Sequence, residues 1–319
     1  MPLFGVLFYK KMNNNQKQQS VEEFVKKFNF DSCVLELLKS IESDNERIKD
    51  LVISKYLQVP LSETEEEDVL DYFINNSVFS AATLANPATS VVTEFLYDPK
   101  ASSPIDKYFF ASKGGKAIHS RLIRVEENLH SLIEEHLKNG KVLIGNLGGG
   151  PSRDVIDVFS KYYRNNDNVR AISVDKDKNS IKRGKRMAEM GGVTSKIEFL
   201  EASFTRYKPK EKFNIILLIG VLCSLPVETC ILLLKKIKPL IEKKGSIIVS
   251  NAAPKMLEDD PFTCFIMNVM GWNLVFKKEE ILKSIFETAG LKWQRSFTDD
   301  YGFHYMGIGI KNNTLFKRF

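Results

Sequence analysis

The sequence predicts an α/β fold with a doubly wound, mostly parallel sheet, preceded by a mostly helical N-terminal region. From Lys141 onward, apolar runs rich in Val, Ile, Leu and Phe alternate with helical stretches. The runs are continuous, as expected for strands covered by helices on both faces. Upstream, the apolar residues follow helical spacing, and 319 residues are enough for two domains.

The N-terminal region is predicted to comprise a flexible leader at residues 1–20 and a helical domain at residues 21–138. Helical spacing begins with Phe24 and Phe28 and continues through residues 34–41, with Asp31-Ser32 as a plausible cap. This domain is expected to act as a lid over substrate or as a dimerisation surface.

Two later segments complete this region. Ser62 and Glu65 match a capping box that opens another helix. Residues 77–115 contain prolines and the Lys113-Gly114-Gly115 break, which predict an irregular connecting or lid-like stretch. Apolar residues from Ile118 to Leu137 then lie on one face of a helix.

Residues 139–319 are expected to form the α/β domain. Its predicted strands are Val142–Ile144, Val169–Val174, Ile197–Leu200, Phe213–Ile219 and Ser246–Ser250. Its predicted helices are Arg153–Tyr163, Lys178–Met190, Pro226–Glu242 and Lys278–Ala289. Leu291–Phe297 and His304–Ile310 predict a terminal hairpin.

Composition limits the classes of function. Hydrophobic residues make up 43% and charged residues 27%, as in soluble globular proteins. The net charge of +6 comes from bases interleaved with acids, so nucleic-acid binding is not indicated. Four scattered cysteines argue against disulfides and metal sites and favour a cytoplasmic location. The apolar stretch Pro2–Tyr9 is too short to span a membrane and lacks the flanks of a secretory signal.

A glycine-rich turn follows the first predicted strand and opens a helix, with the sequence Gly148-Gly149-Gly150-Pro151-Ser152. Glycines let a ligand lie against the backbone at the positive end of the helix. Arg153 stands where a dinucleotide fingerprint needs its third glycine, and no GK[ST] follows, so neither NAD nor a P-loop is favoured. A purely structural turn is the alternative.

Asp175 ends the second predicted strand, about 25 residues after Gly150. A carboxylate at this place can accept hydrogen bonds from both hydroxyls of a ribose. The alternative is that Asp175 caps the next helix.

These two segments carry a resemblance. Residues 146–152 look like the glycine motif of class I methyltransferases, and Val174-Asp175 looks like their acidic second motif. The resemblance covers roughly residues 139–310 and implies a Rossmann-like sheet ending in an antiparallel strand, S-adenosylmethionine as the cofactor, and methyltransferase activity.

The sequence departs from the family's pattern at three places. Asn146 stands where the family usually has Asp or Glu, and Ser152 where it usually has Gly. Ala202 or Ser203 replaces an Asp that often contacts adenine. Binding through backbone groups is compatible with all three changes.

The resemblance also implies which residues bind the cofactor. Residues 201–204 take the place of the adenine contacts, and residues 220–225 are similar to the segment that closes over the cofactor. The implied cofactor-binding residues are Asn146, Gly148, Gly149, Gly150, Pro151, Ser152, Asp175, Lys176, Ala202, Ser203, Phe204, Gly220, Val221 and Arg121.

Methyl transfer requires a base only where the acceptor carries a proton. His304, in the predicted hairpin, and His119, in the helix before the first strand, are the candidate catalytic residues, and each has a structural role as its alternative. Trp272, Met270 and Tyr301 are the candidate substrate contacts, with core packing as the alternative.

The expected acceptor is a small molecule, a carboxylic acid or a hydroxyl compound. Residues 116–121 and 272–274 resemble bacterial methyltransferases that form 3-hydroxy fatty acid methyl esters, which implies a lipid-like carboxylic acid. Two alternatives stay open: an RNA- or protein-directed methyltransferase, and a non-catalytic cofactor-binding protein. The chain has no [DNS]PP[YFW] tetrad and no Pro-Cys pair, which disfavours nucleobase methylation.

Overall fold

The computed structural model describes residues 31–41 and 45–311, which cluster into two compact units. The first comprises the described residues as far as His119 together with Lys255–Asn273. The second comprises Ser120–Pro254 and the described residues from Leu274 onward. The predicted leader and the helix through Phe24 and Phe28 lie outside the described residues.

The first unit is built from helices. Ser62 Oγ accepts a hydrogen bond from Glu65 N, and Glu65 Oε2 accepts one from Ser62 N at 2.8 Å, so the predicted capping box is present. The helices are α3 (Ser32–Ser40), α4 (Glu46–Tyr56), α5 (Glu63–Asn76), α6 (Val78–Ala85), α7 (Ser90–Tyr97), α8 (Pro104–Ala111), α13 (Pro254–Asp259), α14 (Pro261–Val269) and the first turns of α9 (Lys113–Leu137).

The unit boundaries differ from the predicted domain boundary. Residues 255–273, assigned from the sequence to the C-terminal domain, cluster with the N-terminal helices. The reason is aromatic packing by Phe262, whose ring stacks on Tyr56 and tilts against Phe73, with centroid distances of 5.4 Å in both pairs.

The prediction of an irregular stretch over residues 77–115 was wrong, because helices α6, α7, α8 and the start of α9 occupy it. Two of its prolines fall between helices, and Pro104 occupies the first turn of α8, where a missing N–H costs nothing. Gly114 and Gly115 lie inside α9. A methyl group on Gly115 would approach Phe109 O to 2.0 Å, so this glycine permits close packing.

Replacing Gly115 with alanine is expected to lower the free energy of unfolding by about 1–3 kcal/mol, since a rigid backbone carbonyl must move. Urea denaturation followed by circular dichroism measures the change. Lys116→Ala, at an exposed position one residue along the same helix, is the control. An unchanged urea midpoint for Gly115→Ala would show that α8 and α9 do not pack as described.

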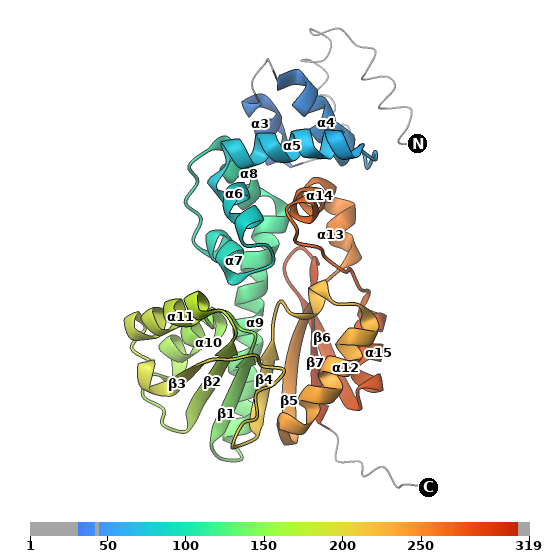
Figure 1. The fold of residues 1–319 in the computed structure, drawn as a ribbon. Coiled ribbons are helices and arrows are strands. Elements are labelled where there is room, and N and C mark those ends of the chain that lie inside the picture. The colour runs from blue at the N-terminus through green and yellow to red at the C-terminus, as the bar shows by residue number, and fades with distance from the viewer. Residues whose placement is uncertain (1–30, 42–44, 312–319) are drawn as a thin grey trace. The chain divides into compact units, whose positions relative to one another are not determined.

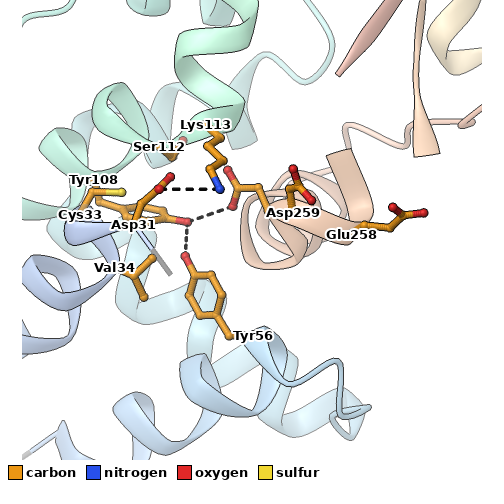
Figure 2. A pocket seen from close by; sticks show the side chains of 10 residues that line it. Asp31, Cys33, Val34, Tyr56, Tyr108, Ser112, Lys113, Glu258 and Asp259 are labelled. Carbon is orange, nitrogen blue, oxygen red and sulfur yellow. Dashed lines mark hydrogen bonds and ion pairs between the residues drawn. The ribbon is translucent and has the colours of Figure 1, made fainter. Parts of the chain in front are cut away.

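A polar cavity of about 320 Å³ lies within the first unit (Figure 2). Beside it the hydroxyls of Tyr56 and Tyr108 are 2.5 Å apart, and Tyr108 donates to Asp260 at 3.4 Å. Asp260 also accepts the backbone N–H of Gly114 at 2.9 Å. Burial raises the pKa of this carboxyl. The buried network therefore fixes the first turn of α9.

The second unit contains one seven-stranded sheet in the order β3-β2-β1-β4-β5-β7-β6 (Figure 1). The first five strands are parallel, and β7 runs antiparallel to both β5 and β6, as predicted. The strands are β1 (Val142–Leu147), β2 (Val169–Asp175), β3 (Ile197–Glu201), β4 (Phe213–Leu218), β5 (Ile241–Ala252), β6 (Leu291–Thr298) and β7 (His304–Lys311).

Helices cover both faces of this sheet. One core joins α9, α10 and α11 to the sheet, and the other joins α12 and α15 to its opposite face. Successive residues of β1 pack on opposite faces of the sheet. Ile144 belongs to the first core and Leu143 to the second. The helical segments are α10 (Arg153–Val158), η2 (Phe159–Tyr163), α11 (Lys178–Met190), η3 (Thr194–Lys196), η4 (Leu222–Ser224), α12 (Val227–Ile237), η5 (Lys238–Leu240) and α15 (Glu279–Thr288).

The predicted doubly wound fold is thus confirmed, with local differences. The helix predicted over Arg153–Tyr163 continues past Val158 as a π-helix. The helix predicted to reach Glu242 ends at Ile237, and Pro239 follows in a short 3₁₀ turn. Proline cannot continue a helix, so β5 begins earlier than predicted, at Ile241.

Candidate active site

The carboxyl ends of β1 and β4 form the topological switch point of the sheet, where ligands of doubly wound folds bind. The strands are neighbours, and the helices that follow them, α10 and α12, lie on opposite faces. The turns after these strands contain Gly148 and Gly220, both candidate cofactor residues.

Gly148 has a positive φ of 68°, and its N–H donates to Val174 O at 2.8 Å. A methyl group on it would lie 3.0 Å from Cε1 of Phe204 and 3.2 Å from Cγ2 of Val221. Candidate cofactor residues from the turns after β1, β3 and β4 therefore lie side by side. Only glycine adopts this backbone and fits this space without strain.

Asn146 is fully buried at the end of β1. Its Nδ2 donates to Ser152 Oγ at 3.1 Å and to Asp154 Oδ1 at 2.9 Å. Burial raises the pKa of Asp154 to about 6, so a carboxylate in place of Asn146 would face a second buried carboxyl. The neutral amide of Asn146, which departs from the family's pattern, thus gives Asp154 a hydrogen-bond donor in place of a second acid.

The oxygen of this amide, Asn146 Oδ1, is buried and accepts no hydrogen bond from any residue in the part of the chain that the structure describes. Gly149 lies directly against it, because a methyl group on Gly149 would be 2.3 Å from Oδ1. An acceptor left without a donor costs about 1–3 kcal/mol, so a water or ligand donor is expected here.

Ser152 adopts the left-handed conformation, with φ 63° and ψ 39°, which explains why glycine is usual at this place in the family it resembles. A left-handed non-glycine residue costs about 1–2 kcal/mol. Its buried hydroxyl bonds to Ser173 Oγ and accepts from Asn146, which offsets this cost. The preceding residue, Pro151, is buried, and its carbonyl lies against Gly184 of α11.

Asp175 is partly exposed at the end of β2. Its Oδ2 accepts the N–H of Gly150 at 2.8 Å, and its Oδ1 accepts the N–H of Asp177 at 2.9 Å. Each carboxylate oxygen has two lone pairs, so both can still accept a hydroxyl. Asp175 does not cap α11, because Asp177 is the N-cap and accepts from Asn179 N and Ser180 N.

The neighbouring candidates lie at the same sheet edge. Ala202 N donates to Asp175 O at 2.8 Å, which joins the end of β2 to the turn after β3. Ser203 and Lys176 are exposed, and Ser203 Oγ bonds to Thr205 Oγ1 at 2.9 Å. Ala202 and Ser203 thus offer no carboxylate for an adenine amino group.

Gly220 has a φ of 76°, and the position of a Cβ on it is open, with no heavy atom of the described chain within 4 Å. Its N–H donates to Ser250 Oγ at 2.7 Å, and its carbonyl accepts from Cys223 Sγ at 3.2 Å. The turn after β4 is therefore anchored to the end of β5.

His304 begins β7 opposite Ala252, the last residue of β5, so it lies at this same edge. It is buried, with Nδ1 3.0 Å from Asp299 Oδ2. Burial lowers the pKa of His304, against the effect of the Asp299 hydrogen bond. Burial raises the pKa of Asp299, but hydrogen bonds led by that from His304 outweigh it and leave that pKa below its ordinary value.

Both lowered pKa values favour an ionised Asp299 and a neutral His304. A neutral imidazole with its Nδ1–H held by a carboxylate leaves Nε2 as a proton acceptor. His304 therefore has the chemistry of a general base. The other candidate, His119, is exposed and belongs to the first unit.

Arg121 of α9 is buried, with an exposed fraction of 5%. Its charge acts on Asp154 of α10, on Cys223 of η4 and on His304 of β7. The charge thus acts on groups from the helix after the glycine turn, from the turn after β4 and from the start of β7. A cation in this place suits an anionic group of the cofactor or of an acceptor.

The candidate substrate residues fall in different units. Met270 and Trp272 belong to the first unit, where Met270 is fully buried and Trp272 is 8% exposed. Tyr301 belongs to the second unit and is partly exposed, with its N–H donating to Asp299 Oδ1 at 2.8 Å.

Asp299 and Lys277 are residues that the sequence interpretation did not assign to the site. The only available signal for Asp299 was its place in the hairpin turn shortly before His304. Lys277 is followed by Lys278, and in the sequence such a pair looks like two surface lysines. In the structure Lys277 is only 3% exposed.

A known family model matches part of the chain, most of it in the second unit. Residues 137–290 match the model described as a methyltransferase domain. They form a class I, S-adenosylmethionine-dependent methyltransferase domain. The chain therefore contains a methyltransferase domain, as predicted. None of the curated proteins compared with the chain matches it.

Solved structures of similar fold support the same architecture. A possible exported protein of Bordetella parapertussis aligns with a TM-score of 0.64 at 13% identity, covering 86% of this chain and 98% of that chain. A candidate O-methyltransferase of Nostoc punctiforme gives 0.52 at 16% identity, covering 94% and 100%. The magnesium protoporphyrin IX methyltransferase of Synechocystis with bound SAH gives 0.50 at 13%, covering 70% and 100%.

The described residues contain neither a candidate membrane span nor a candidate metal site. No helix there is long and apolar enough to cross a membrane. Within the same residues, no group of three or more His, Cys, Asp or Glu side chains is arranged to hold a metal ion.

Proposed function

We propose that the protein transfers a methyl group from S-adenosylmethionine to an oxygen atom of a small-molecule acceptor, a carboxylic acid or a hydroxyl compound. The observation that carries this proposal is the buried His304–Asp299 pair at the carboxyl edge of the sheet, with Nδ1 and Oδ2 3.0 Å apart. Such a pair removes the proton of a hydroxyl during transfer. A carboxylate acceptor needs no base.

Bound S-adenosylmethionine supplies a methyl group on a sulfonium, and the residues of the glycine turn fit this cofactor. Asp175 retains lone pairs for the ribose hydroxyls, and Phe204 and Val221 offer apolar surface beside Gly148. Asn146 Oδ1, buried without a donor among the described residues, suits an ammonium group. Arg121 suits the carboxylate of the amino-acid part.

The acceptor's charge is inferred from two buried cations. Arg121 and Lys277 are 5% and 3% exposed, and the charge of each acts on Cys223 beside the open turn at Gly220. Positive charge in a partly buried site favours an anionic acceptor. Among the proposed acceptors this supports a carboxylic acid, and we also propose that Trp272 contacts the acceptor.

An RNA-directed activity is the second candidate, because α11 presents basic residues. Lys182, Lys185 and Arg186 line an open groove beside the edge strand β3. Glu189 and Glu198 line the same groove and would repel phosphates, which is why we favour a small molecule.

The test combines calorimetric titration with an acceptor screen. We expect S-adenosylmethionine to bind at micromolar concentration, and radiolabelled methyl to pass to carboxylic acids or phenols but not to RNA or protein. Label in RNA would favour the second candidate. A wild-type protein that binds neither the donor nor its demethylated product would overturn the proposal.

A further inference from the structure

Lys277 is a buried ammonium whose hydrogen-bonding capacity is used in full. It precedes α15 and is 3% exposed. Its Nζ donates to Leu222 O at 3.0 Å, Asn251 Oδ1 at 3.0 Å and Val275 O at 3.1 Å. An ammonium has three donors, so these neutral acceptors account for all of them.

Such an arrangement is costly. Burial lowers the pKa of Lys277, which shows that this environment disfavours the charged form. The effective penalty for burying an ion is several kcal/mol, and neutral acceptors repay only part of it. A methionine of similar length would avoid the cost of the buried charge but would leave Leu222 O, Asn251 Oδ1 and Val275 O without this donor. The lysine is therefore explained by what its hydrogen bonds hold.

The bond to Leu222 O holds the turn after β4. Leu222 begins η4 and directly follows Val221, whose side chain lies against Gly148. The same turn is held from β5 by Ser250 Oγ at Gly220 N, and Cys223 O accepts Val275 N at 2.7 Å. Residues 220–223 are thus clamped between the end of β5 and the segment that contains Lys277.

We propose that Lys277 is a positioning residue for methyl transfer. Through Leu222 O it holds the turn at residues 220–224, and with it Val221, in the conformation that binds the methyl donor. This inference rests on the cofactor site proposed above.

The test compares Lys277→Met with Lys278→Met, which removes an exposed lysine one residue along. Hydrogen exchange followed by mass spectrometry reports on the turn without any ligand. In Lys277→Met we expect the amides of residues 220–224 to exchange at least tenfold faster, while those of residues 148–150 keep their wild-type rates. In Lys278→Met both sets should match wild type.

Calorimetric titration with S-adenosylmethionine then tests the consequence. We expect Lys277→Met to raise Kd at least tenfold, equivalent to 1.4 kcal/mol. An affinity within twofold of wild type overturns the proposal even if exchange accelerates, since the lysine would then serve stability alone. Unchanged exchange in residues 220–224 overturns it as well.

A second variant covers the case in which Lys277→Met does not fold. Asn251→Ala removes one of the three acceptors and leaves the lysine in place, so a smaller acceleration in the same residues is expected. If wild-type protein binds no S-adenosylmethionine, the proposed function fails, whereas the exchange experiment still decides whether Lys277 holds the turn.

Discussion

Asp175→Ala is expected to weaken the binding of S-adenosylmethionine at least tenfold, the roughly 1.4 kcal/mol that a hydrogen bond to a charged group contributes. The carboxylate is partly exposed and uses one lone pair of each oxygen on the N–H groups of Gly150 and Asp177. Its removal takes away the ribose acceptors and also releases Gly150 in the glycine turn. Calorimetric titration of both proteins measures the difference in Kd.

Asp177→Ala is the matched control. Asp177 is also a carboxylate beside β2, but its oxygens accept from Asn179 N and Ser180 N as the N-cap of α11. This variant should lose about 1 kcal/mol of unfolding free energy while keeping its cofactor affinity. If Asp177→Ala weakened binding as much as Asp175→Ala, the effect would belong to α11, and Asp175 would not be the ribose acceptor.

The second unit was predictable because its signals are local. Continuous apolar runs, the glycine turn and Asp175 each depend on neighbours within a few residues. The resemblance to class I methyltransferases added the antiparallel strand β7. For the same reason the capping box at Ser62 was predicted correctly, since its partner is three residues away.

The first unit was harder to predict from the sequence, because close packing between helices determined the conformation of its glycines. Gly114 and Gly115 look like a break in sequence, yet both lie in α9, where Phe109 O and Thr263 leave no room for a side chain. The contact between Gly114 and Thr263 joins residues far apart in the chain and has no local signature. Helices are also short there, so each carries little periodicity.

Polar residues of the site were predictable in type but not in role. His304 was a candidate from its place in the hairpin, whereas its partner Asp299 became apparent only when the turn brought the two side chains together. Asn146 looked like a defect in the family's motif until its hydrogen bond to Asp154 explained it. Burial, which sequence does not give directly, separates Lys277 from Lys278.

His304→Ala is expected to lower kcat for a hydroxyl acceptor by about 10²–10⁴-fold, the usual contribution of a general base, while the Kd of S-adenosylmethionine stays within twofold. Asp299 holds Nδ1 at 3.0 Å, which leaves Nε2 to take the proton. Initial rates with radiolabelled donor give kcat, and calorimetry gives Kd. His119→Ala, which removes the exposed histidine, is the control and should keep full activity.

The proposed role of His304 also predicts the direction in which activity changes with pH. Burial lowers the pKa of His304 below its ordinary value of 6.5, and only the neutral imidazole accepts a proton. With a hydroxyl acceptor, activity should therefore be full at pH 7 and fall on acidification through a limb below pH 6.5, which His304→Ala removes. A carboxylate acceptor needs no base, so full activity of His304→Ala with such a substrate would assign His304 a structural role and identify the acceptor as the acid.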